Sequence, residues 1–161
     1  MSNYFARPVV SIIVERGLLR RRILLQRRNK SDPGIPRSLF ELPQGRVKWG
    51  ESLTECVRRE LQEETGMTGF LFRSHVRQTY VRGARLESIT GLVVSEAGER
   101  PYLAVCVVGT ADGEPRASRE SSQPTWFSKR GAMKLIQSGQ VFPLNVPMLV
   151  AYFGNSRDRG R

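Results

Sequence analysis

Cysteine and long apolar runs are scarce in this chain of 161 residues. Its two cysteines, Cys56 and Cys106, are too few for a disulfide framework or a zinc site, so we expect two small buried apolar side chains. The longest apolar runs, at 9–14 and 23–25, fall far short of the roughly 20 residues that a bilayer-spanning helix needs. The first residues also lack the pattern of a secretion signal. These absences predict a globular cytoplasmic protein without a membrane partner.

Acidic residues are also scarce, relative to basic ones. The chain has 15 Asp and Glu against 26 Lys and Arg, which gives a net charge of +11. Residues 51–64 nevertheless hold five glutamates and two arginines, a net charge of −3, so the rest of the chain carries +14. Such a balance favours polyanionic partners, such as nucleotides, polyphosphates or RNA. A basic soluble protein with one charged helix is the alternative interpretation.

Local patterns predict alternating strands and one well-defined helix in the first two thirds of the chain. Residues 7–15 and 20–28, rich in Val, Ile and Leu around Gly17, predict a hairpin. Ser52 and Glu55 form a capping box and Gly66 suits a left-handed end, which predicts a helix over Leu53–Thr65. Strands are expected at 69–81, 88–94 and 102–110, the last one central, whereas 82–87 favours neither state.

The last third is expected to contain a functional loop and two helices. Residues 111–125 contain Gly, Pro, Ser and Asp without an apolar period, which predicts a long loop. Residues 126–127 favour a short strand, and 129–138 and 147–153 favour helices. With no internal repeat or linker, the pattern predicts one α/β or α+β layered sandwich.

Three carboxylates converge on one side of the expected helix. At about 100° per residue, Glu60, Glu63 and Glu64 span about 100° of arc and share the apolar side of the helix. Crowded like charges beside a core are tolerable when a divalent cation neutralises them, and an oxygen ligand set suits magnesium or manganese. Structural salt bridging is the alternative, although Arg59 reaches only part of this charge.

These residues belong to a longer pattern that resembles the Nudix hydrolase signature. The matching positions are Gly45, Glu51, Arg59, Glu60, Leu61, Glu63, Glu64, Gly66 and Met67. Met67 stands where the signature usually has Ile, Leu or Val, a mild departure. The resemblance implies an α/β/α sandwich with a mixed sheet between helices. It further implies a single domain over residues 1–156, and 157–161 read as a disordered basic tail.

The resemblance implies hydrolysis of a nucleoside diphosphate linked to another group, with magnesium or manganese as the metal. Substrates of this class are nucleoside triphosphates, ADP-ribose and nucleotide sugars, and a nucleoside monophosphate is released. By matching positions, Glu60, Glu63 and Glu64 are the expected metal ligands, helped by the Gly45 carbonyl. Glu51 and Arg59 are expected to complete the catalytic set, as an ion pair that holds the metal ligands in place.

An acid outside the signature is also implied. Glu120 stands before Trp126 in a stretch that resembles MutT-type members, where the corresponding acid is a further metal ligand. The general base is expected among Glu60, Glu64 and Glu120, with Glu114 as a weaker choice.

The substrate is less constrained by the sequence. Gln44 replaces the first of two glycines common in the family, and Pro-Gln-Gly resembles dinucleoside polyphosphate hydrolases and RNA 5′-pyrophosphohydrolases. Arg46 stands where those enzymes have another glycine. A non-catalytic nucleotide or RNA sensor is the alternative from another class. In either case the protein is expected to be a monomer or a homodimer. The candidate substrate contacts are Arg28, Arg46, Trp49 and Tyr80.

Overall fold

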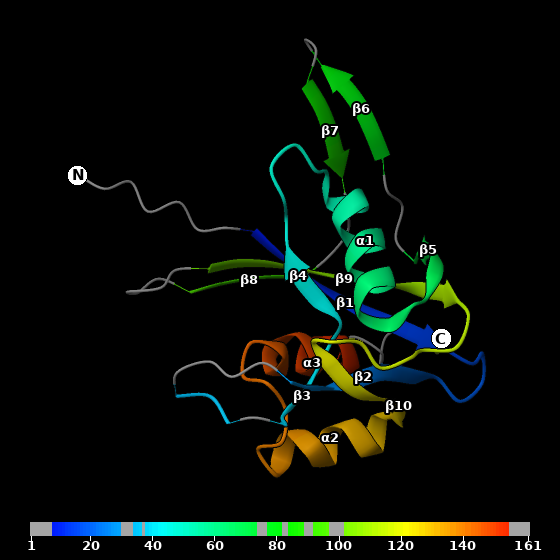
Figure 1. Ribbon diagram of the computed structural model, residues 1–161, viewed down its shortest axis with the longest axis vertical. Coiled ribbons are helices and arrows are strands. Elements are labelled where there is room, and N and C mark those ends of the chain that lie inside the picture. Colours follow the sequence, from blue (N-terminus) through cyan, green and yellow to red (C-terminus); the bar gives the residue numbers. More distant parts are fainter. Residues whose placement is uncertain are drawn as a thin grey trace.

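The computed structural model describes residues 8–29, 34–36, 38–73, 77–81, 84–88, 92–96 and 102–154. The expected tail at 157–161 lies outside these residues. The elements (Figure 1) are β1 (Pro8–Arg16), β2 (Arg22–Arg28), β3 (Phe40–Glu41), β4 (Gln44–Arg46), α1 (Leu53–Thr65), β5 (Thr68–Phe72), β6 (Arg77–Val81), β7 (Ala84–Ser88), β8 (Leu92–Glu96), β9 (Tyr102–Asp112), β10 (Ser121–Ser128), α2 (Lys129–Gln137) and α3 (Asn145–Gly154).

The described strands form one mixed sheet and a separate β6–β7 pair. The main order is β10-β2-β1-β9-β5, with β3 on β2, β4 on β1 and β8 on β9. β1 and β9 are parallel, so that Val9 lies opposite Ala104 and Val14 opposite Gly109, and the other pairings are antiparallel. The parallel pair joins the N-terminal third of the chain to its C-terminal half. The mixed sheet confirms the expected fold class.

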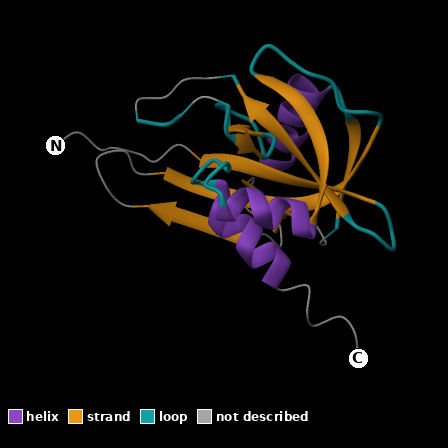
Figure 2. Cartoon of the chain, turned by 90° about the horizontal axis from the view of Figure 1, so that it is seen from below, coloured by secondary structure: helices purple, strands orange, loops and turns teal. Residues whose placement is uncertain are grey.

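Alternating apolar residues bury both faces of the central strands. Ile12 packs in a cluster with Val57 and Leu61 of α1, whereas Ile13 packs with Met148 and other residues of the α2–α3 side. Strands covered on both faces have near-continuous apolar sequences, as β1 and β9 do. Figure 2 shows the sheet between α1 on one side and the α2–α3 pair on the other. This arrangement is the expected α/β/α sandwich.

Most of the expected elements are present. The hairpin of β1 and β2, the helix over Leu53–Thr65 and the two C-terminal helices are confirmed. Cys56 and Cys106 are buried with free thiols, and burial raises the pKa of each to about 12. No helix in the described part of the chain is long and apolar enough to cross a bilayer.

The sequence-based boundaries differ from the structure in three places. The loop expected at 111–125 is wrong at both ends, because β9 continues to Asp112 and β10 begins at Ser121, pairing with β2 around a bulge between Ser122 and Thr125. The strand expected at 69–81 is divided into β5 and β6. The ambiguous 82–87 contributes to β7, which pairs with β6.

Candidate active site

Capping residues fix both ends of helix α1. Ser52 Oγ accepts a hydrogen bond from the Glu55 amide at 3.2 Å, and Glu55 Oε2 accepts one from the Ser52 amide at 2.8 Å. Gly66 closes the helix in the left-handed conformation, with φ of 70°. These caps fix which residues face the sheet and therefore where the glutamates of α1 lie.

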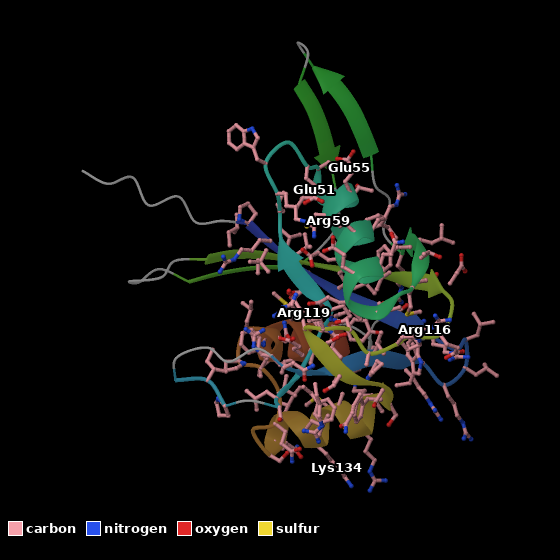
Figure 3. All side chains as sticks on the ribbon, viewed as in Figure 1. Glu51, Glu55, Arg59, Arg116, Arg119 and Lys134 are labelled. Carbon is pink, nitrogen blue, oxygen red and sulfur yellow. The ribbon has the colours of Figure 1, made fainter. Side chains whose placement is uncertain are left out.

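The Arg59 guanidinium joins the loop before α1 to the helix. Its Nε and Nη2 bond to Glu51 Oε1 and Oε2 at 2.6 and 2.8 Å, a two-point fork, and Nη2 also donates to the Arg46 carbonyl at 3.1 Å (Figure 3). These hydrogen bonds from Arg59 hold the pKa of Glu51 at about 2, below its usual 4.5. The Glu51–Arg59 ion pair expected from the sequence is therefore present.

The same guanidinium contacts two glutamates of the acidic side of α1. Arg59 Nη1 lies 2.6 Å from Glu60 Oε1 and 3.0 Å from Glu63 Oε2. Hydrogen bonds to Glu51 and Glu60 outweigh burial and raise the pKa of Arg59. Glu63 is half exposed and has Lys48 Nζ at 3.7 Å, so it lies at the edge of the apolar side rather than within it. Glu64, at the other end of the arc, is buried.

Gly45 gives the Glu60 carboxylate its space. A Cβ placed at residue 45 would lie 1.9 Å from the Glu60 carboxyl carbon and 2.0 Å from Oε1, far inside any permitted contact. The absence of a side chain at Gly45 therefore lets the β4 backbone and the Glu60 carboxylate approach each other closely. Any larger residue at this position would displace Glu60.

Glu64 is buried and oriented by amide donors. Its Oε2 accepts hydrogen bonds from Gln26 Nε2 at 2.7 Å and from the Gln44 amide at 3.0 Å. Ser121 Oγ donates to the Glu64 carbonyl at 3.1 Å, which ties α1 to the start of β10. A buried carboxylate with several donors is held in one orientation. The structure therefore fixes Glu64 through three different strands.

A buried polar network surrounds Gln44 of β4, the residue next to Gly45. Gln44 Oε1 accepts from Asn145 Nδ2 at 2.9 Å and from Ser11 Oγ at 3.2 Å, and Gln44 Nε2 donates to Glu41 Oε2 at 3.3 Å. Glu41 also pairs with Arg28 Nη1 at 2.8 Å. The links of Gln44 to Ser11 and Asn145 span 33 and 101 residues, and no local pattern predicts them. Gln44, which departs from the glycine usual in the family, therefore has a structural role.

One cavity of about 760 Å³ brings most of the candidate residues together. Its lining includes four acids and five basic residues, among other side chains. They are Val9, Arg28, Gln44, Gly45, Arg46, Lys48, Arg59, Glu60, Glu63, Glu64, Ser118, Arg119, Glu120, Phe142 and Leu144. Lys48, Ser118 and Arg119 were not expected from the sequence. For Ser118 and Arg119, the one available signal was their position next to Glu120 in the sequence. Glu120 itself reaches the cavity from the β9–β10 loop.

Three candidate residues with described side chains, Glu51, Trp49 and Glu114, lie outside this lining. Glu51 stands behind Arg59, consistent with a bracing position. Trp49 is fully exposed to solvent. The backbone of Tyr80 belongs to β6, but its side chain is outside the described part of the chain. Glu114, the weaker alternative to Glu120, pairs instead with Arg16 at 2.7 Å.

The donor set of the cavity suits a hard divalent cation. Its acids offer only oxygen ligands, and Glu60 occupies a space that a Cβ at residue 45 would fill. Among the described residues, no group of three acids, histidines or cysteines is arranged to hold a metal ion by itself, and Glu60 and Glu63 pair with Arg59. An incomplete protein ligand set fits magnesium, which keeps waters and takes substrate phosphates as ligands.

Solved structures share this fold at low sequence identity. A MutT protein from Methanosarcina mazei Go1 is 21% identical with a TM-score of 0.69, covering 98% of this chain and 100% of that one. The E. coli ORF135 protein is 24% identical with a TM-score of 0.66, covering 99% and 96%. The Ap4A hydrolase of C. elegans is 15% identical with a TM-score of 0.61, covering 92% and 96%. A NUDIX domain profile matches residues 6–141, and the chain therefore belongs to the NUDIX domain family.

Proposed function

We propose that this chain is a magnesium-dependent pyrophosphohydrolase that cleaves a nucleoside diphosphate linked to another group and releases a nucleoside monophosphate. Nudix family members are generally pyrophosphohydrolases that use divalent metals. The observation that carries the proposal is the cavity in which Glu60, Glu63, Glu64 and Glu120 meet a set of basic side chains. To hold a metal–diphosphate complex, a site needs acidic side chains that bind the metal ion and basic side chains that bind the phosphates.

In this proposal the acids hold the metal and the basic residues hold the phosphates. Glu60, Glu63, Glu64 and the Gly45 carbonyl would be its ligands, with Glu120 as a further one. The bound ion supplies charge neutralisation and lowers the pKa of water. Guanidinium groups bind phosphate oxygens through two donors and lysine acts as a point charge, which suits Arg46, Lys48 and Arg119 for the diphosphate.

Arg59 and Glu51 position the other groups rather than react. The two-point contact of Arg59 with Glu51 fixes the loop that carries Gly45 against α1, and its third contact orients Glu60. The acceptor of the proton from the attacking water is one of Glu60, Glu64 and Glu120, which all line the cavity.

The opposite wall of the cavity suits a base. Phe142 and Leu144 line it with Val9, and Leu144 and Val9 pack against the apolar cluster on the α2–α3 side. The Arg28 guanidinium lies 4.8 Å from the centre of the Phe142 ring, which provides a cationic and aromatic surface. A nucleotide would therefore place its base by Phe142 and its phosphates toward α1.

A substrate panel tests the proposal. Nucleoside triphosphates, ADP-ribose, nucleotide sugars, dinucleoside polyphosphates and 5′-triphosphorylated RNA are incubated with magnesium or manganese, and products are separated by chromatography. The proposal predicts metal-dependent release of a nucleoside monophosphate from at least one small substrate. Binding without turnover would favour a sensor, and RNA cleavage that is faster than all others and falls steeply with salt would favour RNA as the substrate.

A further inference from the structure

Gln26 is a polar side chain buried at a place where the sheet is otherwise apolar. Its exposed fraction is 0%, and it directly follows the apolar run 23–25 of β2. Side chains alternate between the two faces of a strand, and Leu24 packs in the apolar cluster on the α1 side whereas Leu25 packs in the cluster on the α2–α3 side. Gln26 therefore shares the face of Leu24 and points toward α1.

One end of the Gln26 amide is committed to Glu64. Gln26 Nε2 donates to Glu64 Oε2 at 2.7 Å, and the reverse orientation of the amide would bring two oxygens together at that distance. The amide therefore turns its carbonyl oxygen away from Glu64. Gln26 Oε1 is buried and has no hydrogen-bond partner in the part of the chain that the structure describes.

This unsatisfied carbonyl destabilises the folded state. A buried acceptor without a donor is unfavourable, and buried polar groups without a partner are rare in native proteins. A methionine at residue 26 would fill similar space without an unpaired oxygen. Polar groups that are kept against stability are typical of functional sites. The role of Gln26 is therefore expected to lie in the group that its nitrogen holds, which is Glu64.

Gln26 acts on Glu64 from behind the cavity. Glu64 lines the cavity, whereas Gln26 does not. Glu64 Oε2 also accepts from the Gln44 amide at 3.0 Å, so two uncharged donors, one from β2 and one from β4, meet at one oxygen. Gln26 is too deeply buried to touch a substrate, and its influence on the site passes through the Glu64 carboxylate. Removal of a polar group that orients a metal ligand typically lowers metal affinity or activity by roughly 10- to 100-fold.

We propose that Gln26 is a positioning residue for the divalent metal, which holds the Glu64 carboxylate in the orientation that binds the ion. The inference rests on the proposed function, because Glu64 is a metal ligand there, but it does not depend on the identity of the substrate. It makes β2 part of the metal site, together with β4 and α1. The metal-free fold should gain little from the Gln26 amide, whereas metal binding should require it.

Manganese binding to the metal-free protein tests the inference, with the free ion measured by its electron paramagnetic resonance signal. Gln26→Met is expected to raise the dissociation constant for manganese about 10-fold or more, while the midpoint of metal-free thermal unfolding stays within about 4 °C of wild type. Leu24→Met is the matched control, because Leu24 is fully buried on the same face of β2 and its replacement should leave manganese binding unchanged. A Gln26→Met protein that unfolds well below this range would show that the amide holds the fold, and would overturn the inference.

A second substitution shows whether Gln26 acts through Glu64. In a Glu64→Gln background, Gln26→Met is expected to change the dissociation constant by less than about 2-fold, because the effects of two residues that share one contact are not additive. The same loss of affinity in both backgrounds would place the action of Gln26 elsewhere and overturn the inference.

The outcomes separate this inference from the proposed function. Weakened manganese binding by Gln26→Met, in a protein that hydrolyses no substrate of the panel, would support the role of Gln26 and reject hydrolysis. Equal manganese binding by wild type and Gln26→Met, with metal-dependent turnover by wild type, would overturn the inference alone. A wild-type protein that binds no manganese would reject both the inference and the metal of the proposed function.

Discussion

At the scale of single residues, the Arg59 guanidinium sets the geometry of the site. It bonds Glu51 with two nitrogens and reaches both Glu60 and Glu63, so one side chain connects the loop, the helix and the acids. Glu64 is held separately by Gln26 and the Gln44 amide. The acids therefore have two independent supports, and substitutions at them are expected to differ in their effects on turnover and stability.

Glu63→Gln is expected to lower turnover by roughly 100-fold or more while the fold survives. Glu63 is half exposed, and exposed ion pairs contribute only about 0–1 kcal/mol to stability. The measurement is kcat at saturating magnesium, beside a thermal unfolding curve. Glu114→Gln is the matched control, because Glu114 pairs with Arg16 away from the cavity. Full magnesium-dependent turnover in Glu63→Gln would reject its place among the metal ligands.

Gly45→Ala is expected to abolish most activity through displacement of Glu60. The added methyl group would lie within 2.2 Å of three Glu60 carboxyl atoms, so either the side chain or the β4 backbone must move. Turnover and the midpoint of thermal unfolding are measured together. At Gly154 a Cβ meets no atom within 4 Å, so Gly154→Ala should retain activity. A Gly45→Ala enzyme as active as this control would contradict the close approach.

At the scale of elements, α1 combines a structural and a chemical side. Its apolar residues Cys56, Val57 and Leu61 are fully buried, and its caps fix both ends. Arg59 bonds to Glu51 in the loop before α1 and to the Arg46 carbonyl at the end of β4, so the strand, the loop and the helix form one unit. The stability of this unit should respond to substitutions at the cap and to protonation of Glu51.

Ser52→Ala removes the N-cap of α1 and is expected to lower the free energy of unfolding by about 1 kcal/mol, within a range of roughly 0.5–2. Urea denaturation monitored by circular dichroism gives this value. Glu55→Gln is the comparison, because glutamine also completes a capping box and should cost less. An equal or larger loss in Glu55→Gln would show that charge, and not the cap geometry, stabilises this end.

Protonation of Glu51 should weaken the Arg59 link at low pH. Its pKa is lowered to about 2 by Arg59, so ionised Glu51 stabilises the folded state above its usual pKa of 4.5. This contribution declines as the pH falls from 4.5 toward 2. The difference in unfolding free energy between wild type and Glu51→Gln should be constant above about pH 5 and shrink below it. A difference independent of pH would contradict the depressed pKa.

At the scale of the whole molecule, a cluster of acids lies within a strongly basic protein. The chain carries +11, yet four acids line the cavity. In the proposed function, the surrounding positive charge would attract anionic substrates, and the local acids would hold the cation that such substrates bring. Both features follow from the uneven distribution of charge along the sequence.

Local patterns predicted the elements better than the contacts between them. The bounds of α1 followed from Ser52, Glu55 and Gly66, because capping is a property of a few adjacent residues. The extent of β10 was missed, since Ser121 and Ser122 join it through pairing with β2 and not through apolar alternation. The parallel pairing of β1 with β9 likewise depends on distant residues.

The contacts among the candidate residues were predicted where one segment carries them and missed where distant segments meet. The glutamates of α1 and their ion pair with Arg59 lie within one stretch of sequence. The positions of Lys48, Arg119 and Phe142 in the cavity depend on three different connections. The buried links of Gln44 to Ser11 and Asn145 span 33 and 101 residues, and no short motif encodes them.

The most direct test of the account is a crystal soaked with manganese and a slowly hydrolysed nucleotide, measured at the manganese absorption edge. The account predicts anomalous density in contact with oxygens of Glu60, Glu63 or Glu64 and with phosphate oxygens of the nucleotide. A well-ordered nucleotide without manganese, with Glu60 and Glu63 still bonded to Arg59, would contradict it.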